Sequence, residues 1–174
     1  MNKNRVVGLV GMLLFSSLFC TSELYAQKAT AWKKVCGEQA NPATCRIRHD
    51  LFLQRKNTEG KLETVGRILR LNVLYSNVDR GNRRMPYLSI QVPMGVDLRP
   101  GTVFRIDNAK EIQLPFLRCT SFGCDASIQL SGKILQNMKA GKEIKVGFKK
   151  WGDDNVTVIT ATLTGFTAAL SGIK

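Results

Sequence analysis

Apolar and polar residues alternate with a period of two along most of this chain. The first clear segment starts at residue 45, and its positions on one side are Cys45, Ile47, His49, Leu51 and Leu53. The positions on the other side are Arg46, Arg48, Asp50 and Gln54. A period of two is typical of a strand with one buried and one solvated face, so the segment is predicted to be a half-buried strand.

Similar alternation predicts further strands, separated by turn residues at positions 57–60, 99–101, 107–108 and 152–155. In the strand predicted over 62–75, one face carries Val65, Leu69, Leu71, Val73 and Tyr75, and Arg67 interrupts that face. The other predicted strands are 87–92, 103–107, 111–116, 126–130, 143–150 and 156–163. Two short helices are expected, one capped by Ser131 and ending at Gly141, the other over 164–170.

This order of elements predicts the fold class. About eight strands with hairpin-length connections, and no strand–helix alternation, indicate an all-β antiparallel sandwich with one or two short helices. We favour an immunoglobulin-like topology over a closed barrel. The length of 174 residues fits one domain.

The first 26 residues have the pattern of a secretory signal peptide. Lys3 and Arg5 precede an uncharged stretch over 6–19, and Ala26 is a small residue before the expected cleavage site. An uncleaved anchor is the alternative, and a lipoprotein is disfavoured because Phe19 precedes Cys20 where a small residue is required. We therefore expect residues 27–174 to form the mature domain, located in the periplasm, on the outer-membrane surface or in the medium.

Removal of the signal peptide would leave four cysteines, in two sequence-local pairs. These are Cys36, Cys45, Cys119 and Cys124. Three connectivities are possible, and we favour the local one, Cys36–Cys45 with Cys119–Cys124. A redox C-x-x-C pair or a four-cysteine zinc site is disfavoured, because four and eight residues separate the members of the two pairs.

Three motifs resemble a known family. Residues 92–107 (VPMGVDLRPGTVFRID) are similar to the "LPLGv-L-pGv-iD" segment of the invasion-associated locus B proteins, residues 114–126 (LPFLRCTSFGCDA) to their "LPF-RC---GC-A" signature, and residues 165–170 to their "GFTAAL" ending. The resemblance extends from about Trp32 to Leu170. It implies an exported α-proteobacterial envelope protein with an immunoglobulin-like sandwich and a role in host-cell invasion, notably of erythrocytes, although many relatives occur in free-living bacteria. It carries no catalytic residues over.

The residues themselves do not suggest an enzyme. His49 is the only histidine, and its position on the apolar face favours a structural role over that of a catalytic base. No phosphate-binding, dinucleotide-binding or metalloprotease motif occurs, so we expect no catalytic residues, no metal and no cofactor.

Positive charge is the feature with the clearest functional meaning. The formal net charge is +13, and ten of the 26 Lys and Arg residues lie between positions 46 and 84. The candidate contacts for a partner are Arg46, Arg48, Arg80, Arg83 and Arg84. Such a field attracts polyanions, for example lipopolysaccharide, anionic headgroups or glycosaminoglycans, whereas nucleic acid is not expected for an exported chain with few aromatic residues. A solubilising surface on a housekeeping periplasmic structural factor is the alternative.

Overall fold

The computed structural model describes residues 28–29, 32–37, 44–77 and 84–173, and it is built mainly from β-strands. The strands are β1 (Lys28–Ala29), β2 (Lys33–Val35), β3 (Arg46–Lys56), β4 (Leu62–Asn77), β5 (Arg84–Val92), β6 (Thr102–Ile106), β7 (Ile112–Leu114), β8 (Arg118–Thr120), β9 (Gly123–Gln129), β10 (Glu143–Lys149) and β11 (Val156–Thr162). The helices are α1 (Gly132–Ala140) and α2 (Phe166–Ser171).

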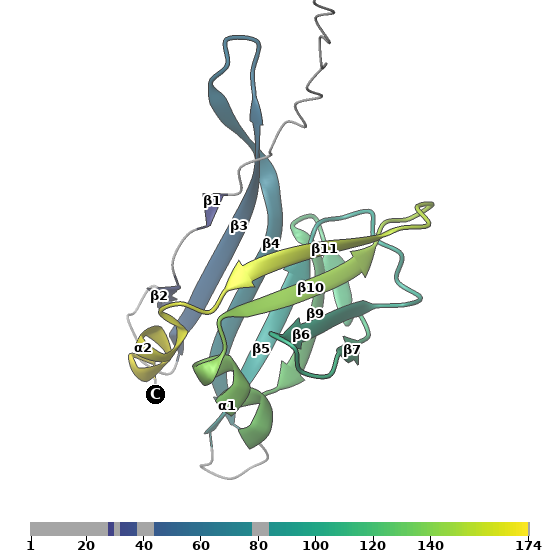
Figure 1. The fold of residues 1–174 in the computed structure, drawn as a ribbon. Coiled ribbons are helices and arrows are strands. Elements are labelled where there is room, and N and C mark those ends of the chain that lie inside the picture. The colour runs from purple at the N-terminus through teal and green to yellow at the C-terminus, as the bar shows by residue number, and fades with distance from the viewer. Residues whose placement is uncertain (1–27, 30–31, 38–43, 78–83, 174) are drawn as a thin grey trace, which may run out of the picture.

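The strands form two antiparallel sheets that pack against each other. The larger sheet has the order β1-β3-β4-β5-β9-β8, with β2 also paired to β3, and the smaller has the order β11-β10-β6-β7. Strands β10 and β11 cross one face of the larger sheet (Figure 1). Helix α1 precedes β10 and helix α2 follows β11, so both lie near the same end of the smaller sheet.

Alternation along the strands creates the core between the sheets. On β3, Ile47, His49 and Leu51 are buried while their neighbours are only partly covered. Val146 and Phe148 of β10, on the smaller sheet, belong to the same apolar cluster as Ile47 and Leu51. This arrangement buries one face of each sheet and leaves the other face of the larger sheet free for polar side chains.

The helices have the local features expected from the sequence. The Ser131 side chain accepts a hydrogen bond from the Ile134 backbone N–H, so it caps α1 as predicted. In α2, Phe166 and Leu170 are both buried, and the Phe166 ring packs edge-on against Trp32. The Trp32 indole donates a hydrogen bond to the Thr162 carbonyl, which ties the start of the domain to β11.

The long β3–β4 hairpin is irregular where it leaves the sandwich and projects beyond it (Figure 1). Its register shifts between Leu51 and Phe52 and again between Leu53 and Gln54. Each shift adds one residue to β4, so positions beyond it change face. Arg67 therefore does not interrupt the buried face as the alternation predicted, because the bulge turns it to the outer face.

The mostly β, two-sheet antiparallel architecture with two short helices is confirmed. The consecutive strands β3, β4 and β5 lie side by side, and this order does not establish the predicted immunoglobulin-like connectivity. The predicted strand over 111–116 ends at Leu114, and a further strand, β8, follows it. The expected signal peptide over 1–26 lies outside the described residues.

Candidate functional site

Arginine side chains gather on the outer face of the larger sheet. Alternation on β3 and β4 places Arg46, Arg48 and Arg70 there, opposite the buried positions. The group is completed by Arg67, Arg118 and two carboxylates. We call this set the arginine face, and its charged members are Arg46, Arg48, Arg67, Arg70, Arg118, Asp50 and Asp125.

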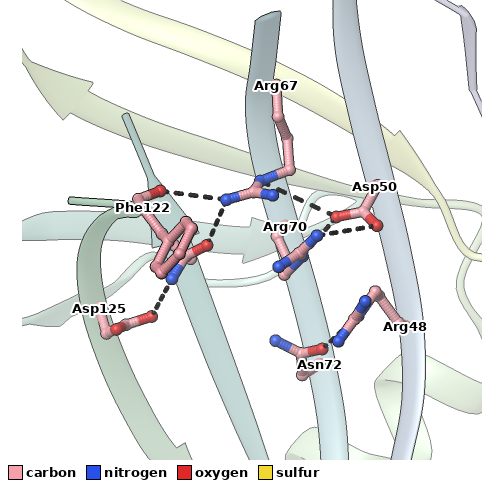
Figure 2. Close-up of polar contacts among 8 residues, drawn as sticks. Arg48, Asp50, Arg67, Arg70, Asn72, Phe122 and Asp125 are labelled. Carbon is pink, nitrogen blue, oxygen red and sulfur yellow. Dashed lines mark hydrogen bonds and ion pairs between the residues drawn. The ribbon is translucent and has the colours of Figure 1, made fainter. Parts of the chain in front are cut away.

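Asp50 contacts two of these arginines, Arg67 and Arg70, from the neighbouring strand (Figure 2). Arg70 bonds to both carboxylate oxygens of Asp50, with Nε–Oδ1 at 2.5 Å and Nη2–Oδ2 at 3.3 Å. The Nε of Arg67 lies 3.9 Å from Oδ1. Because only 16% of the Asp50 side chain and 21% of the Arg70 side chain are exposed, this forked pair is partly shielded from water.

A chain of hydrogen bonds extends from Arg67 across the sheet. Arg67 Nη2 donates to Gln91 Oε1 at 2.6 Å and to the Phe122 carbonyl at 3.0 Å. Gln91 Nε2 donates in turn to Asp125 Oδ1 at 3.0 Å, and Arg118 Nε lies 3.3 Å from Asp125 Oδ2. The side chains of this chain of contacts come from four adjacent strands, β4, β5, β9 and β8. Figure 2 shows the part that runs from Arg67 to Asp125.

Arg48 forms no carboxylate pair among the described residues. Its Nε donates to the Asn72 amide oxygen at 3.3 Å. Partial burial lowers the pKa of Arg48, and the charges of Arg70 and Arg46 lower it further. The pKa of Arg67 is lowered in the same way, first by burial and then by Arg70. The guanidinium groups on this face therefore repel one another and are incompletely neutralised.

Five arginines against two aspartates give the face a local excess of three positive charges. Planar guanidinium groups bind phosphate, sulfate and carboxylate groups through paired N–H donors. The geometry is therefore suited to anion binding. It offers no candidate nucleophile with an adjacent base among the described residues.

The sequence-predicted contacts do not all lie on this face. Arg46 and Arg48 do, whereas Arg80 and Arg83 lie outside the described residues. Arg84 begins β5 at an inward-facing register position, with its guanidinium 5.7 Å from the Tyr75 ring centre and Nη2 donating to the Tyr75 carbonyl. The structure therefore does not bring Arg84 together with Arg46 and Arg48.

Three arginines of this face are not among the sequence-predicted contacts. Arg67 and Arg70 lie within the basic region 46–84, and Arg118 lies outside it. Alternation along β4 indicates that Arg70 lies on the outer face, because it stands between the buried positions Leu69 and Leu71. Nothing local indicated Arg67 or Arg118, because a bulge turns the first and the β5–β9–β8 order brings in the second.

The cysteines are joined locally. Disulfides connect Cys36 to Cys45 and Cys119 to Cys124, which is the pairing the sequence favoured. Within the described part of the chain, no group of three or more His, Cys, Asp or Glu side chains is placed to hold a metal ion.

His49 is fully buried against the edge of the Trp32 ring, at a centroid distance of 5.3 Å. Both ring nitrogens are buried without a hydrogen-bond partner. Burial lowers the pKa of His49, with a smaller opposing effect from Asp50. This environment gives the imidazole a packing role and keeps it away from solvent.

Neither helix in the described part of the chain is both long enough and apolar enough to cross a membrane.

Comparison with known proteins gives a consistent result. The model of the family described as "Invasion associated locus B (IalB) protein" matches residues 32–174. Two Brucella abortus proteins named invasion protein B homologs, from strain 2308 and from biovar 1 strain 9-941, are each 25% identical over 146 residues, covering 82% of this chain and 75% of theirs. The crystal structure of invasion associated protein B from Bartonella henselae superposes with a TM-score of 0.58 at 19% identity, covering 84% of this chain and 93% of that one. At that identity the likeness supports the fold alone.

Proposed function

This chain belongs to the invasion associated locus B family, and on that premise we propose that it is an exported, non-enzymatic binding protein whose arginine face holds a polyanion of the envelope or of a host-cell surface. The observation that supports this proposal most directly is the excess of guanidinium groups over carboxylates on one face of the larger sheet. Phosphate groups of lipopolysaccharide and sulfate groups of glycosaminoglycans share the anionic chemistry that such a face recognises.

The names of the relatives support a role at a host cell. Two of them are called invasion protein B homologs, and a third is called an invasion associated protein. A polyanion-binding sandwich would serve invasion by attaching the bacterium, or a shed protein, to sulfated or phosphorylated surfaces.

Two disulfides support an extracytoplasmic location, because disulfides persist in oxidising compartments such as the periplasm. Export would remove the signal peptide by cleavage before Gln27, and mass spectrometry of the exported protein would then find 148 residues. Protease accessibility on intact cells separates the two roles. Digestion of the protein on whole cells supports a surface role, and protection until the outer membrane is opened supports the housekeeping periplasmic one.

Salt-dependent elution from immobilised heparin tests the binding site. Arg46 and Arg48 form no ion pair with any described carboxylate, so replacing both with Ser should leave the melting temperature nearly unchanged. The same variant should elute at clearly lower salt, because exposed phosphate or sulfate contacts are screened as ionic strength rises.

Two further variants make the test specific. Lys139→Ser combined with Lys142→Ser removes the same charge from the α1–β10 junction and should elute close to the parent. The triple variant Arg80→Ser, Arg83→Ser, Arg84→Ser examines the three other sequence-predicted contacts. If only that triple variant loses affinity, these three residues bind the polyanion and the arginine face does not. If the parent protein itself elutes at low salt, the positive charge only keeps the protein soluble and does not bind a polyanion.

A further inference from the structure

A second, chemically different site lies between the β6–β7 hairpin and α1. A cavity of about 370 Å³ opens to solvent there, near the low end of the ~300–1,000 Å³ range of small-molecule pockets. It is lined on one side by the hairpin and on the other by Lys133, Ile134 and Asn137 of α1. In Figure 1 it corresponds to the region between α1 and the β6–β7 end of the smaller sheet.

The walls of this cavity are fixed by their own hydrogen bonds. The Asp107 carboxylate accepts from the backbone N–H groups of Lys142 and Glu143 at 3.0–3.2 Å, which ties the β6–β7 turn to the start of β10. Gly141, which follows α1, has no room for a Cβ, since one would lie 2.7 Å from Ile106 Cγ2. The helix end and the turn are therefore in close contact, and the cavity is preformed.

The lining divides into an apolar floor and a positively charged rim. Phe104 and Ile106 are almost fully buried, and Ile112 and Ile134 are half-buried against the core. At the rim, Lys110 and Lys133 are exposed and form no ion pair with any described residue.

The remaining charges at the rim come from one weak pair. Arg105 and Glu111 lie 3.7 Å apart, and the Arg105 side chain is partly exposed while that of Glu111 is mostly exposed. The lining as a whole therefore carries two more positive than negative charges.

We propose that this pocket binds a small monomeric amphiphile with one anionic head and a short acyl chain, of the medium-chain fatty acid type. The acyl chain would cover Ile112 and Ile134, and the carboxylate would lie between Lys110 and Lys133. A sugar or nucleotide fits less well, because among the lining side chains only Asn137 and Glu111 carry oxygen acceptors. The site is independent of the arginine face, which lies on the other sheet.

Isothermal titration of the whole mature protein with decanoate, below its critical micelle concentration, tests the proposal. Saturable binding near one equivalent is expected. Butyrate has the head without the chain, and decyltrimethylammonium has the chain with the opposite charge, so both should bind at least about tenfold more weakly. Equal binding of the cation and the anion would overturn the charged-rim assignment.

Variants locate the site. Lys110→Glu with Lys133→Glu should weaken decanoate binding about tenfold, whereas Lys150→Glu, at the opposite end of β10, should leave it unchanged. Ile134→Trp should fill the cavity and abolish binding. Should that variant not fold, amide NMR shifts of the parent answer the same question. Shifts that avoid Ile106, Ile112, Ile134 and Asn137, or no binding of decanoate at all, would refute the proposal.

Discussion

Asp50 is expected to stabilise the fold and to oppose ligand binding at the same time. Its carboxylate is the nearest negative charge to Arg67 and Arg70, so it occupies the place that a bound anion would take. Asp50→Asn keeps the shape of the side chain and removes the charge. The variant should be less stable than the parent and bind heparin more tightly.

The size of the stability loss follows from the contacts. The forked Arg70–Asp50 pair is about four-fifths buried, so it should stabilise the fold more than a surface ion pair does, although solvent still partly screens it. We expect a loss of about 1–2 kcal/mol. For a domain of this size, each kcal/mol lowers the melting temperature by about 2–4 °C. The loss should shrink in high salt, because added salt screens the repulsion among the arginines.

Thermal unfolding at low and high salt, together with heparin elution, measures both effects. Asp154→Asn is the matched control, since it removes one exposed carboxylate from the β10–β11 turn, 3.6 Å from Lys149. Both variants raise the net charge by one. If Asp50→Asn elutes at higher salt than Asp154→Asn, the gain in affinity comes from the charge removed at the arginine face and not from the net charge. If Asp50→Asn elutes with or before the parent while losing stability, the arginine face is structural and the reasoning fails.

The other predictions concern the fold. Gly123→Ala should lower the free energy of unfolding by about 2 kcal/mol or more, because Gly123 has φ +133° and a Cβ there would lie 2.2 Å from the Val92 carbonyl oxygen. Gly60→Ala is the control, because a Cβ there has open space and should cost only the ~1 kcal/mol of a left-handed backbone. Equal losses for the two variants in urea denaturation would contradict this prediction. The pKa of His49 is lowered from 6.5, so the unfolded chain binds more protons below that value, and stability should fall as pH drops below about 6.5. His49→Leu should flatten that acid slope in melting curves, and an unchanged slope would assign it to other groups. Replacing both Cys119 and Cys124 with Ala should cost about 2 kcal/mol by chain entropy, and a variant as stable as the parent would show that the six-residue ring contributes nothing.

Much of the architecture could be predicted from local sequence patterns. Alternation on β3 located Ile47 and Leu51 in the core, and the Ser131–Gly141 pair located α1. These predictions succeed because a strand face or a helix cap depends on residues only a few positions apart. The two disulfides belong to the same class, since each joins cysteines that are close in sequence.

The tertiary structure alone decided which charges meet. A single bulged residue reverses the faces of a strand, so alternation assigned Arg67 to the wrong side. Arg118 reaches the same surface only because β9 and β8 continue the sheet beyond β5, a pairing between segments far apart in the chain. The apolar cavity beside α1 likewise needs the hairpin and the helix to be packed together. Local periodicity fixes which way a side chain points relative to its own strand, but the neighbours it finds there are set by long-range packing, which a single sequence does not encode in any short window.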